Sequence, residues 1–440
     1  MTIKEIHSIF LQSKGVITDS RIKNEGALFF ALRGENFNGN DFVPSALENG
    51  CRYAIVDDAR FKNEGKCIYV GNALRTLQEL ATFHRNWINI PVIGITGTNG
   101  KTTTKELVNA VLSKQYRTIC TKGNFNNHIG VPLTLLSMTK EHEIAIIEMG
   151  ANHPFEIAEL CSISKPNFGI ITSIGKAHLE GFGSFENIIK TKKELYDYVT
   201  SNNGLLFVNG THELLMDISN AAKRITYGSS KSSETSGSIS GSNPFVVIDY
   251  QSKNGAINVR TNLIGGYNFD NIMAAISVGQ YFNVASLDIK SALEEYIPDN
   301  NRSQLVKTKT NTLILDAYNA NPSSMSASII NFKGFTSRHK VAILGEMLEL
   351  GAEYEKEHRN IHNLLKECDF EKVYLTGNWK SIEEDNYTKR FNSTSEMIEY
   401  FKTNPMDNKT ILIKGSRGKR LETIVPFLYL EFQLAKRFLF

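Results

Sequence analysis

Residues 91–106 read Pro-Val-Ile-Gly-Ile-Thr-Gly-Thr-Asn-Gly-Lys-Thr-Thr-Thr-Lys-Glu, and the rest of the chain is organised around this stretch. Its first half is apolar and β-branched, which predicts a short buried strand. Gly97 and Gly100 follow, and they allow backbone angles that other residues resist. Beyond them the apolar residues recur at helical spacing, at Leu107, Val108, Val111 and Leu112. The stretch therefore predicts a strand, a glycine-rich turn and a helix.

A turn of this kind is typical of a phosphate-binding loop. It directs backbone N–H groups and a helix N-terminus at one place, where a phosphate is favoured. Lys101 would add a positive charge there, and Thr102 would offer a hydroxyl to a magnesium ion. The general pattern G-x-x-x-x-G-K-[ST] is not met in full, because Ile95 stands where its first glycine would be. A turn that only needs glycine is the alternative, but the order strand, turn, Lys-Thr and helix favours phosphate binding.

Length and composition restrict the class of protein. The 440 residues are too many for one ordinary core and predict two or three domains. The net charge of +3 is weak, and no basic run interleaved with aromatic residues supports nucleic-acid binding. The five cysteines form no C-x-x-C pair, so we expect reduced thiols in a cytoplasm and neither a disulfide framework nor a zinc site.

The chain carries no pattern that predicts membrane insertion. Its N-terminus lacks the apolar core of a signal peptide, and no apolar run is long enough to cross a bilayer. The apolar run at 425–432 is interrupted by polar residues, and we expect it to be a helix docked on its own domain.

The order of predicted elements divides the chain into three α/β segments. Residues 1–88 are expected to form a small domain with strands at 27–32 and 53–56. Residues 89–298 would form a nucleotide domain with a parallel sheet, in which the Ser- and Gly-rich segment 229–243 is a mobile hairpin tip. Residues 299–440 predict a doubly wound, Rossmann-like domain. Its predicted strands are 313–315, 341–344, 373–375 and 411–413.

Polar residues gather where predicted strands end, which is where ligands collect in open α/β sheets. Glu148 ends one buried strand, and a carboxylate there is suited to holding Mg²⁺ on a nucleotide. His178 follows the next strand, although a hydrogen-bonded loop histidine has the same appearance in a sequence. Asp316 ends the first strand of the third segment. These residues indicate a site at one edge of the sheets.

Together these motifs resemble the Mur ligase family of bacterial cell-wall synthesis, over essentially the whole chain. The matching blocks are 19–21, 34–41, 96–102, 124–132, 148–152, 178–180, 316–325, 344–351 and 414–417. The form of the phosphate loop is shared with folylpolyglutamate synthetases. The blocks Tyr-Asn-Ala-Asn-Pro at 318–322 and Gly-Glu-Met-Leu-Glu-Leu at 345–350 are similar to the members that add a dipeptide. Phe155 departs from the family pattern, which often has glycine there.

The resemblance implies a fold and an activity. It implies three α/β domains: a small N-terminal domain for a UDP-linked substrate, a central ATPase domain and a C-terminal Rossmann-like domain. The implied reaction joins D-alanyl-D-alanine to UDP-N-acetylmuramoyl-tripeptide through an acyl phosphate, and it uses ATP and two Mg²⁺ ions. Half-sites on separate domains imply a closure that excludes water. A cytoplasmic monomer without nucleic-acid or membrane partners is expected.

The resemblance also implies roles for individual residues. Catalysis would fall to Lys101, His178 and Lys192, the last as a lysine carbamylated by CO₂. ATP would be held by Gly97, Thr98, Asn99, Gly100, Lys101, Thr102, Thr103, Asn268, Asn271, Arg302 and Asp316. The magnesium ions would be held by Thr102, Glu148, His178 and Lys192. The UDP-substrate would be held by Ser20, Arg21, Gly34, Asn126 and Asn127, and the dipeptide side would be formed by Tyr318, Asn319 and Asn321.

Several alternatives stay open at this stage. Lys193 stands beside Lys192, so either lysine could be the carbamylated one, and a solvated surface lysine is the plainer interpretation. A sister ligase that adds a single diamino acid or glutamate would share the phosphate loop, as would a folylpolyglutamate-type ligase. A nucleotide-binding module without ligation is the alternative of another class. Whether the third residue of the tripeptide is lysine or diaminopimelate is not encoded in any motif.

Overall fold

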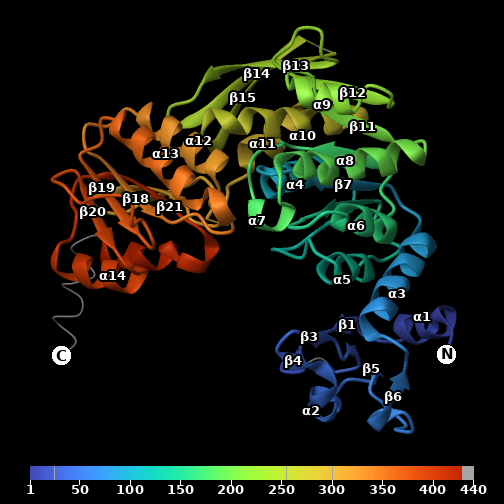
Figure 1. Ribbon diagram of the computed structural model, residues 1–440. Helices are drawn as coiled ribbons and strands as arrows, with labels where there is room; N and C mark the ends of the chain where they lie inside the picture. Colours follow the sequence, from blue (N-terminus) through green and yellow to red (C-terminus); the bar gives the residue numbers. More distant parts are fainter. Residues whose placement is uncertain (24, 254, 300, 429–440) are drawn as a thin grey trace.

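The computed structural model describes residues 1–440 except 24, 254, 300 and 429–440. Its strands form three main sheets that follow one another along the chain and lie in separate parts of the molecule (Figure 1). The N-terminal part, drawn in blue, projects from the green central part, and the orange and red C-terminal part lies on the other side. The predicted three-domain α/β fold is confirmed, whereas the boundaries at residues 88 and 298 stay predictions.

The N-terminal domain is built on a parallel sheet of strand order β1-β2-β5-β6. Both predicted strands are present, as β2 and β5. The elements are α1 (Ile3–Leu11), β1 (Val16–Ile17), β2 (Leu28–Phe30), β3 (Arg33–Gly34), β4 (Phe37–Asn38), η1 (Gly39–Phe42), α2 (Val43–Glu48), β5 (Tyr53–Val56), η2 (Ala59–Phe61), β6 (Cys67–Tyr69) and α3 (Ala73–Ile88).

The central domain carries a nine-stranded sheet of order β15-β14-β13-β12-β11-β10-β7-β9-β8. Its elements are β7 (Val92–Thr96), α4 (Lys101–Leu112), β8 (Thr118–Cys120), α5 (Gly130–Leu136), β9 (Ile144–Glu148), α6 (Glu156–Ser164), β10 (Phe168–Ile171), α7 (Leu179–Phe182), α8 (Phe185–Ser201), β11 (Leu205–Asn209), α9 (Glu213–Ile218), β12 (Arg224–Gly228), β13 (Thr235–Gly241), β14 (Phe245–Ser252), β15 (Gly255–Ile264), η3 (Gly266–Asn268), α10 (Phe269–Tyr281) and α11 (Ser286–Glu295).

Seven of these strands run parallel, from β8 to β13, and β14 and β15 extend the sheet antiparallel. The prediction of a hairpin tip over 229–243 is wrong for residues 235–241, which form β13, and only the end of the segment lies in the connection between β13 and its antiparallel neighbour β14. β13 pairs with β12 on one side and with β14 on the other. Ser and Gly have low strand propensity, but backbone pairing with two neighbours outweighs that preference.

The C-terminal domain has a six-stranded sheet of order β16-β17-β21-β18-β19-β20, parallel except for the edge strand β16. All four predicted strands are present, as β17, β18, β19 and β21. The elements are β16 (Gln304–Lys307), β17 (Thr312–Asp316), α12 (Pro322–Lys333), β18 (Lys340–Gly345), η4 (Gly351–Glu353), α13 (Tyr354–Lys366), β19 (Lys372–Thr376), β20 (Thr388–Phe391), α14 (Thr394–Thr403), β21 (Thr410–Lys414), η5 (Arg417–Lys419) and η6 (Leu421–Phe427).

The apolar run expected as a C-terminal helix begins within η6, whose Leu421 and Ile424 are buried in the core of this domain. The rest of the run, residues 429–432, lies outside the described residues. None of the helices in the described chain combines the length and the apolar character that crossing a membrane requires.

Burial of the central strands positions the candidate site. Every residue of β7 and β9 is buried, since helices cover both faces of this parallel sheet. The core on one face continues through Leu77 and Leu80 of α3 into the N-terminal domain. The carboxyl ends of β7, β9 and β10 meet at one edge, and the phosphate loop, Glu148 and the segment leading to His178 leave the sheet there.

A chain of two buried histidines ties the N-terminal domain to the central one. His84 of α3 donates from Nε2 to the carbonyl oxygen of Met138, at 2.9 Å, because a carbonyl can only accept. Its Nδ1 is therefore the acceptor for Nε2–H of His7 in α1, at 3.0 Å. Both rings are almost completely buried, at 4% and 1% exposure. This pair of hydrogen bonds requires a neutral His84, whose Nδ1 must accept.

Replacing His7 by phenylalanine should make the stability of the protein less sensitive to acid. Burial lowers the pKa of His7 and of His84. The unfolded chain therefore binds more protons than the folded protein as the pH falls through about 6.5, and the free energy of unfolding falls with it. Urea unfolding at several pH values between about 7.5 and 5.5 measures this slope. The slope should be smaller in His7→Phe. His142→Gln is the control, because His142 lies on a partly exposed loop, and it should leave the slope unchanged. Equal slopes in wild type and His7→Phe would contradict the role given to His7.

Candidate active site

The predicted phosphate loop is present and is held in shape by the residues that follow β10. Gly97 and Gly100 have φ of +145° and +82°, which explains the need for glycine at both positions. Thr98 N donates to Ser173 O at 2.8 Å, and Thr172 Oγ1 donates to Asn99 O at 2.6 Å. The segment after β10 therefore fixes the loop between β7 and α4. Sequence reasoning missed Thr172 and Ser173, because short polar residues after a strand are common.

Alanine at Gly100 should weaken both the fold and nucleotide binding. Its Cβ would lie 2.5 Å from Asn271 Oδ1, and its φ would stay in the left-handed region. A side chain there costs about 1–3 kcal/mol in strain alone. We expect a lower melting temperature and a reduced thermal shift on adding ADP and Mg²⁺. Gly65→Ala is the control, since an added Cβ there meets no atom within 4 Å. A full ADP shift in Gly100→Ala would contradict the expectation.

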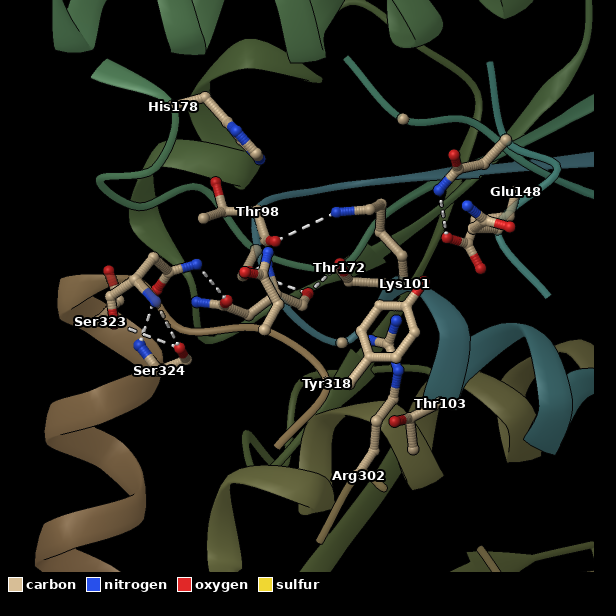
Figure 2. Close-up of a pocket in the computed structure, with 18 of the residues that line it drawn as sticks. Thr98, Lys101, Thr103, Glu148, Thr172, His178, Arg302, Tyr318, Ser323 and Ser324 are labelled. Carbon is tan, nitrogen blue, oxygen red and sulfur yellow. Dashed lines mark hydrogen bonds between the residues drawn. The ribbon is translucent and has the colours of Figure 1, made fainter. Parts of the chain in front are cut away.

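A cavity of about 740 Å³ opens between the phosphate loop and the C-terminal domain (Figure 2). Most of the predicted site residues line it, and they come from several separate segments of the central and C-terminal domains. They are Thr98, Asn99, Gly100, Lys101, Thr103, Asn126, Asn127, Glu148, His178, Asn268, Asn271, Arg302, Asp316, Tyr318, Asn319 and Asn321. Thr102 and Lys192 do not line the cavity; both are buried, at 4% and 3% exposure.

The predicted UDP-substrate residues are divided between two domains. Ser20, Arg21 and Gly34 lie in the N-terminal domain and do not line the cavity. Arg21 is exposed and pairs with Asp19 at 2.7 Å, and the ring of Phe37 covers Gly34. Asn126, by contrast, donates from its amide to Glu148 Oε1 at 2.8 Å. The structure thus gives Asn126 a contact to a predicted metal ligand, and its contact to a UDP-substrate stays a prediction.

Two neighbouring lysines form no ion pair with a carboxylate within the described residues: Lys101, which is partly exposed, and Lys192, which is buried. Lys101 Nζ donates to the carbonyls of Gly97 and Thr98, at 2.7 and 3.1 Å, and burial lowers its pKa to about 8. Lys192 of α8 forms no ion pair within the described part of the chain, and its Nζ lies 5.5 Å from the ring centroid of Phe182. Burial, and then the charge of Lys101, lowers the pKa of Lys192 to about 7. Lys193 instead pairs with Asp197 on the outer side of the helix.

Two buried oxygen atoms beside the loop lack a hydrogen-bond partner within the described residues: Thr102 Oγ1 and Glu148 Oε2. Glu148 Oε2 does lie 3.9 Å from Lys105 Nζ, as an ion pair. A hydroxyl and a carboxylate are hard oxygen ligands, of the kind that Mg²⁺ takes in proteins. No group of three His, Cys, Asp or Glu side chains in the described residues is arranged to hold a metal by itself. A magnesium ion that is shared with nucleotide phosphates needs only one or two protein ligands, so the donors present fit such an ion.

His178 follows the strand β10 at the entrance of α7, in a left-handed conformation with φ of +49°. Its Nδ1 contacts the carboxylate of Glu349, which comes from the loop after β18 in the C-terminal domain. Burial lowers the pKa of the His178 imidazole, and the charge of Glu349 opposes that shift. Figure 2 shows the ring directed toward the phosphate loop. Glu349 was part of a motif used for the family resemblance, but no role had been predicted for it.

The C-terminal domain faces the loop with an aromatic ring between two arginines. The guanidinium carbon of Arg302 lies 3.9 Å from the ring centroid of Tyr318, and that of Arg417 lies 5.6 Å from it. Arg302 Nε is buried and has no hydrogen-bond partner among the residues that the structure describes. Asn321 caps α12 and donates from its amide to Asn99 Oδ1 in the phosphate loop, at 2.8 Å. The two domains therefore meet directly at the loop.

Two further sets of predicted residues in the cavity wall are held by hydrogen bonds and ion pairs to neighbouring side chains. Asn271 donates to Asn268 Oδ1 at 2.9 Å and accepts from Thr104 of α4 at 3.0 Å. Asp316 is paired with Lys414 at 2.7 Å and accepts from Ser328 at 2.6 Å. Lys414 and Arg417 line the cavity as well, although no individual role had been predicted for them.

These features define a class of protein: a three-domain enzyme with a nucleotide-binding phosphate loop at the meeting point of its central and C-terminal domains. Models of the Mur ligase family match most of the chain. Residues 12–94 match the "Mur ligase family, catalytic domain", residues 95–279 the "Mur ligase middle domain" and residues 301–417 the "Mur ligase, glutamate ligase domain". The chain belongs to the Mur ligase family.

Individual relatives cover nearly the full length. The UDP-N-acetylmuramoyl-tripeptide–D-alanyl-D-alanine ligase of Bacillus subtilis is 34% identical over 94% of this chain and 93% of its own. That of Escherichia coli is 30% identical over 96% and 95%. Among solved structures, MurF of Acinetobacter baumannii is similar with a TM-score of 0.86 and 28% identity, over 97% of this chain and 98% of its own. MurF of Thermotoga maritima in complex with ADP has a TM-score of 0.84 and 26% identity, over 97% and 99%.

Proposed function

We propose that this chain is an ATP-dependent ligase that joins D-alanyl-D-alanine to UDP-N-acetylmuramoyl-tripeptide in the synthesis of peptidoglycan precursors. One observation carries the proposal: the phosphate loop and the Tyr-Asn-Ala-Asn-Pro segment of the C-terminal domain line the same cavity. Proteins named for this activity are similar to the chain over almost its whole length. A sister ligase or a folylpolyglutamate-type enzyme would share the loop. The relatives at 30–34% identity over nearly the full length are instead named for the dipeptide reaction.

The reaction needs two negatively charged groups to be brought together. The carboxylate of the tripeptide attacks the γ-phosphate of ATP, which gives an acyl phosphate and ADP. The amino group of the dipeptide then attacks the acyl carbon, and phosphate leaves as the amide bond forms. Lys101 projects over the loop where the phosphates would lie, and its charge would reduce the repulsion in the first step. Contact between the domains would keep water from the acyl phosphate.

Two magnesium ions are proposed to bind beside the loop. Thr102 and Glu148 would hold one of them, since each has a buried oxygen atom without a hydrogen bond within the described residues, and such oxygens fit a hard cation. The Glu148 carboxylate would share its charge between this ion and Lys105 Nζ, which lies 3.9 Å from Oε2. His178 and Lys192 would hold the other, with Lys192 as a carbamate. When bound, the ions would neutralise phosphate charge and orient the reacting oxygens.

Carbamylation of Lys192 agrees with its surroundings. CO₂ adds to a neutral amine, and a pKa of about 7 leaves a large neutral fraction at physiological pH. The product is an anion, which would face the cation of Lys101 and remove the cost of two neighbouring uncompensated amines. Lys193 has neither the burial nor the position, because it pairs with Asp197. We therefore assign the modification to Lys192.

The remaining predicted residues are proposed to bind the nucleotide and the two substrates. Asn268, Asn271, Arg302 and Asp316 are proposed to contact the nucleotide, with Asp316 acting through its partner Lys414. Ser20, Arg21 and Gly34 would receive the UDP end, and Asn126 and Asn127 the part of that substrate nearer the loop. Tyr318, Asn319 and Asn321 would contact the dipeptide. We propose a cytoplasmic monomer, a compartment with which five free cysteines agree.

Phosphate release from ATP tests the function. The purified protein is incubated with Mg²⁺, UDP-N-acetylmuramoyl-tripeptide and either D-alanyl-D-alanine or single amino acids. Release that requires the dipeptide, with a product whose mass is that of the amide, is the expected result. Parallel assays with the lysine and the diaminopimelate tripeptide identify the preferred third residue. Release with a single amino acid would indicate a sister ligase, and no release with any amine would contradict ligation.

A further inference from the structure

The C-terminal domain touches the α7 segment of the central domain at two places. Glu349 contacts Nδ1 of His178, and the carbonyl oxygen of Glu349 accepts from the backbone N–H of Glu180 at 3.4 Å. Separately, Lys176 forms an ion pair with Glu357 of α13 at 3.0 Å. The two contacts use residues that are close in sequence within each domain. Only the first contact involves a residue of the proposed metal site.

Backbone geometry marks the Glu349 contact as more than chance packing. Both Glu349 and His178 adopt left-handed conformations, with φ of +61° and +49°. Residues other than glycine rarely adopt this backbone conformation unless the surrounding structure imposes it. Such residues concentrate at functional sites. The side chain of Glu349 is 56% exposed, so burial of apolar surface does not explain its position.

Hydrogen-bond chemistry fixes what the contact does to the histidine. A carboxylate can only accept, so Nδ1 of His178 carries a proton. In the neutral imidazole, Nε2 then carries the lone pair. Nε2 is then free to bind a divalent cation on the side of the ring away from Glu349. Histidines that bind metals are commonly oriented in this way by a carboxylate on their other nitrogen.

We propose that Glu349 is a positioning residue, which sets the tautomer and the orientation of His178 when the C-terminal domain closes on the central domain. The proposal rests on the proposed function, because it assumes that His178 holds a magnesium ion. Since Glu349 and His178 belong to different domains, the second cation site is complete only in the closed arrangement. Acyl phosphate formation would then await closure, which limits the loss of ATP to water.

Binding of Mn²⁺, followed by electron paramagnetic resonance, tests the proposal without relying on turnover. Mn²⁺ replaces Mg²⁺, and the full-length protein is titrated in the presence of a non-hydrolysable ATP analogue and UDP-N-acetylmuramoyl-tripeptide. In Glu349→Ala, we expect one of two Mn²⁺ ions to bind about 10- to 100-fold more weakly, the usual cost of losing an orienting partner. Glu349→Gln keeps a neutral acceptor for Nδ1–H, so it should fall between Glu349→Ala and wild type.

Two comparisons separate positioning from domain adhesion. Glu357→Ala breaks the neighbouring interdomain ion pair without touching His178, and should leave both Mn²⁺ affinities unchanged. In a His178→Ala background, Glu349→Ala should have no further effect on Mn²⁺ binding. Wild-type affinities in Glu349→Ala, or an equal loss in Glu357→Ala, would overturn the proposal. Neither result bears on ligation itself, which the wild-type phosphate-release assay decides.

Discussion

Alanine in place of Lys192 is expected to lower the turnover number of phosphate release about 10²- to 10³-fold, the range for loss of one charged group that acts on the transition state. The variant cannot form a carbamate, so the second proposed magnesium ion loses its anionic ligand. Because Lys192 is buried, at 3% exposure, alanine leaves an unfilled space at its position.

Acetate or formate should restore part of the activity of Lys192→Ala, because a free carboxylate can occupy that space and supply the missing charge. Lys193→Ala is the matched control: it removes the neighbouring lysine, whose partner is Asp197, and should retain wild-type turnover. A ¹³C NMR signal from ¹³CO₂ bound as a carbamate should be present in wild type and in Lys193→Ala, and absent from Lys192→Ala. The reverse pattern would assign the carbamate to Lys193.

Lys101→Ala is the second change from which we expect a large loss. The ammonium group is held over the phosphate loop by two carbonyl oxygens, and in the proposed reaction it supplies positive charge to the transferred phosphoryl group. Its removal should lower turnover about 10²- to 10³-fold. ADP binding should weaken less, since the backbone N–H groups of the loop and the start of α4 remain.

Phosphate release and the ADP-dependent thermal shift measure the two effects separately. Lys114→Ala is the control, because Lys114 lies just beyond the other end of α4 and pairs with Glu295. It should show wild-type values in both assays. If Lys101→Ala turned over at the wild-type rate, the loop would only bind nucleotide and the charge that drives phosphoryl transfer would have to come from elsewhere.

Local sequence signals were sufficient for much of the fold. The strands β7, β9 and β17 are continuous apolar runs, because both faces of their sheets are covered by helices. Gly97 and Gly100 were recognisable because their backbone angles exclude most other residues. Phe155, which departs from the family glycine, adopts the left-handed conformation with φ of +70° and is 77% exposed, which explains why glycine suits that position.

What the sequence by itself determined is therefore the main parallel strands of the three domains, the phosphate loop and the resemblance to the family. The tertiary structure alone decided that Thr172 and Ser173 hold the loop, that β13 joins the sheet, and that Glu349 meets His178. The reason is physical: a glycine turn or a buried strand is specified by neighbours along the chain. A hydrogen bond between domains depends on how separately folded sheets pack, and no spacing within a single segment records it.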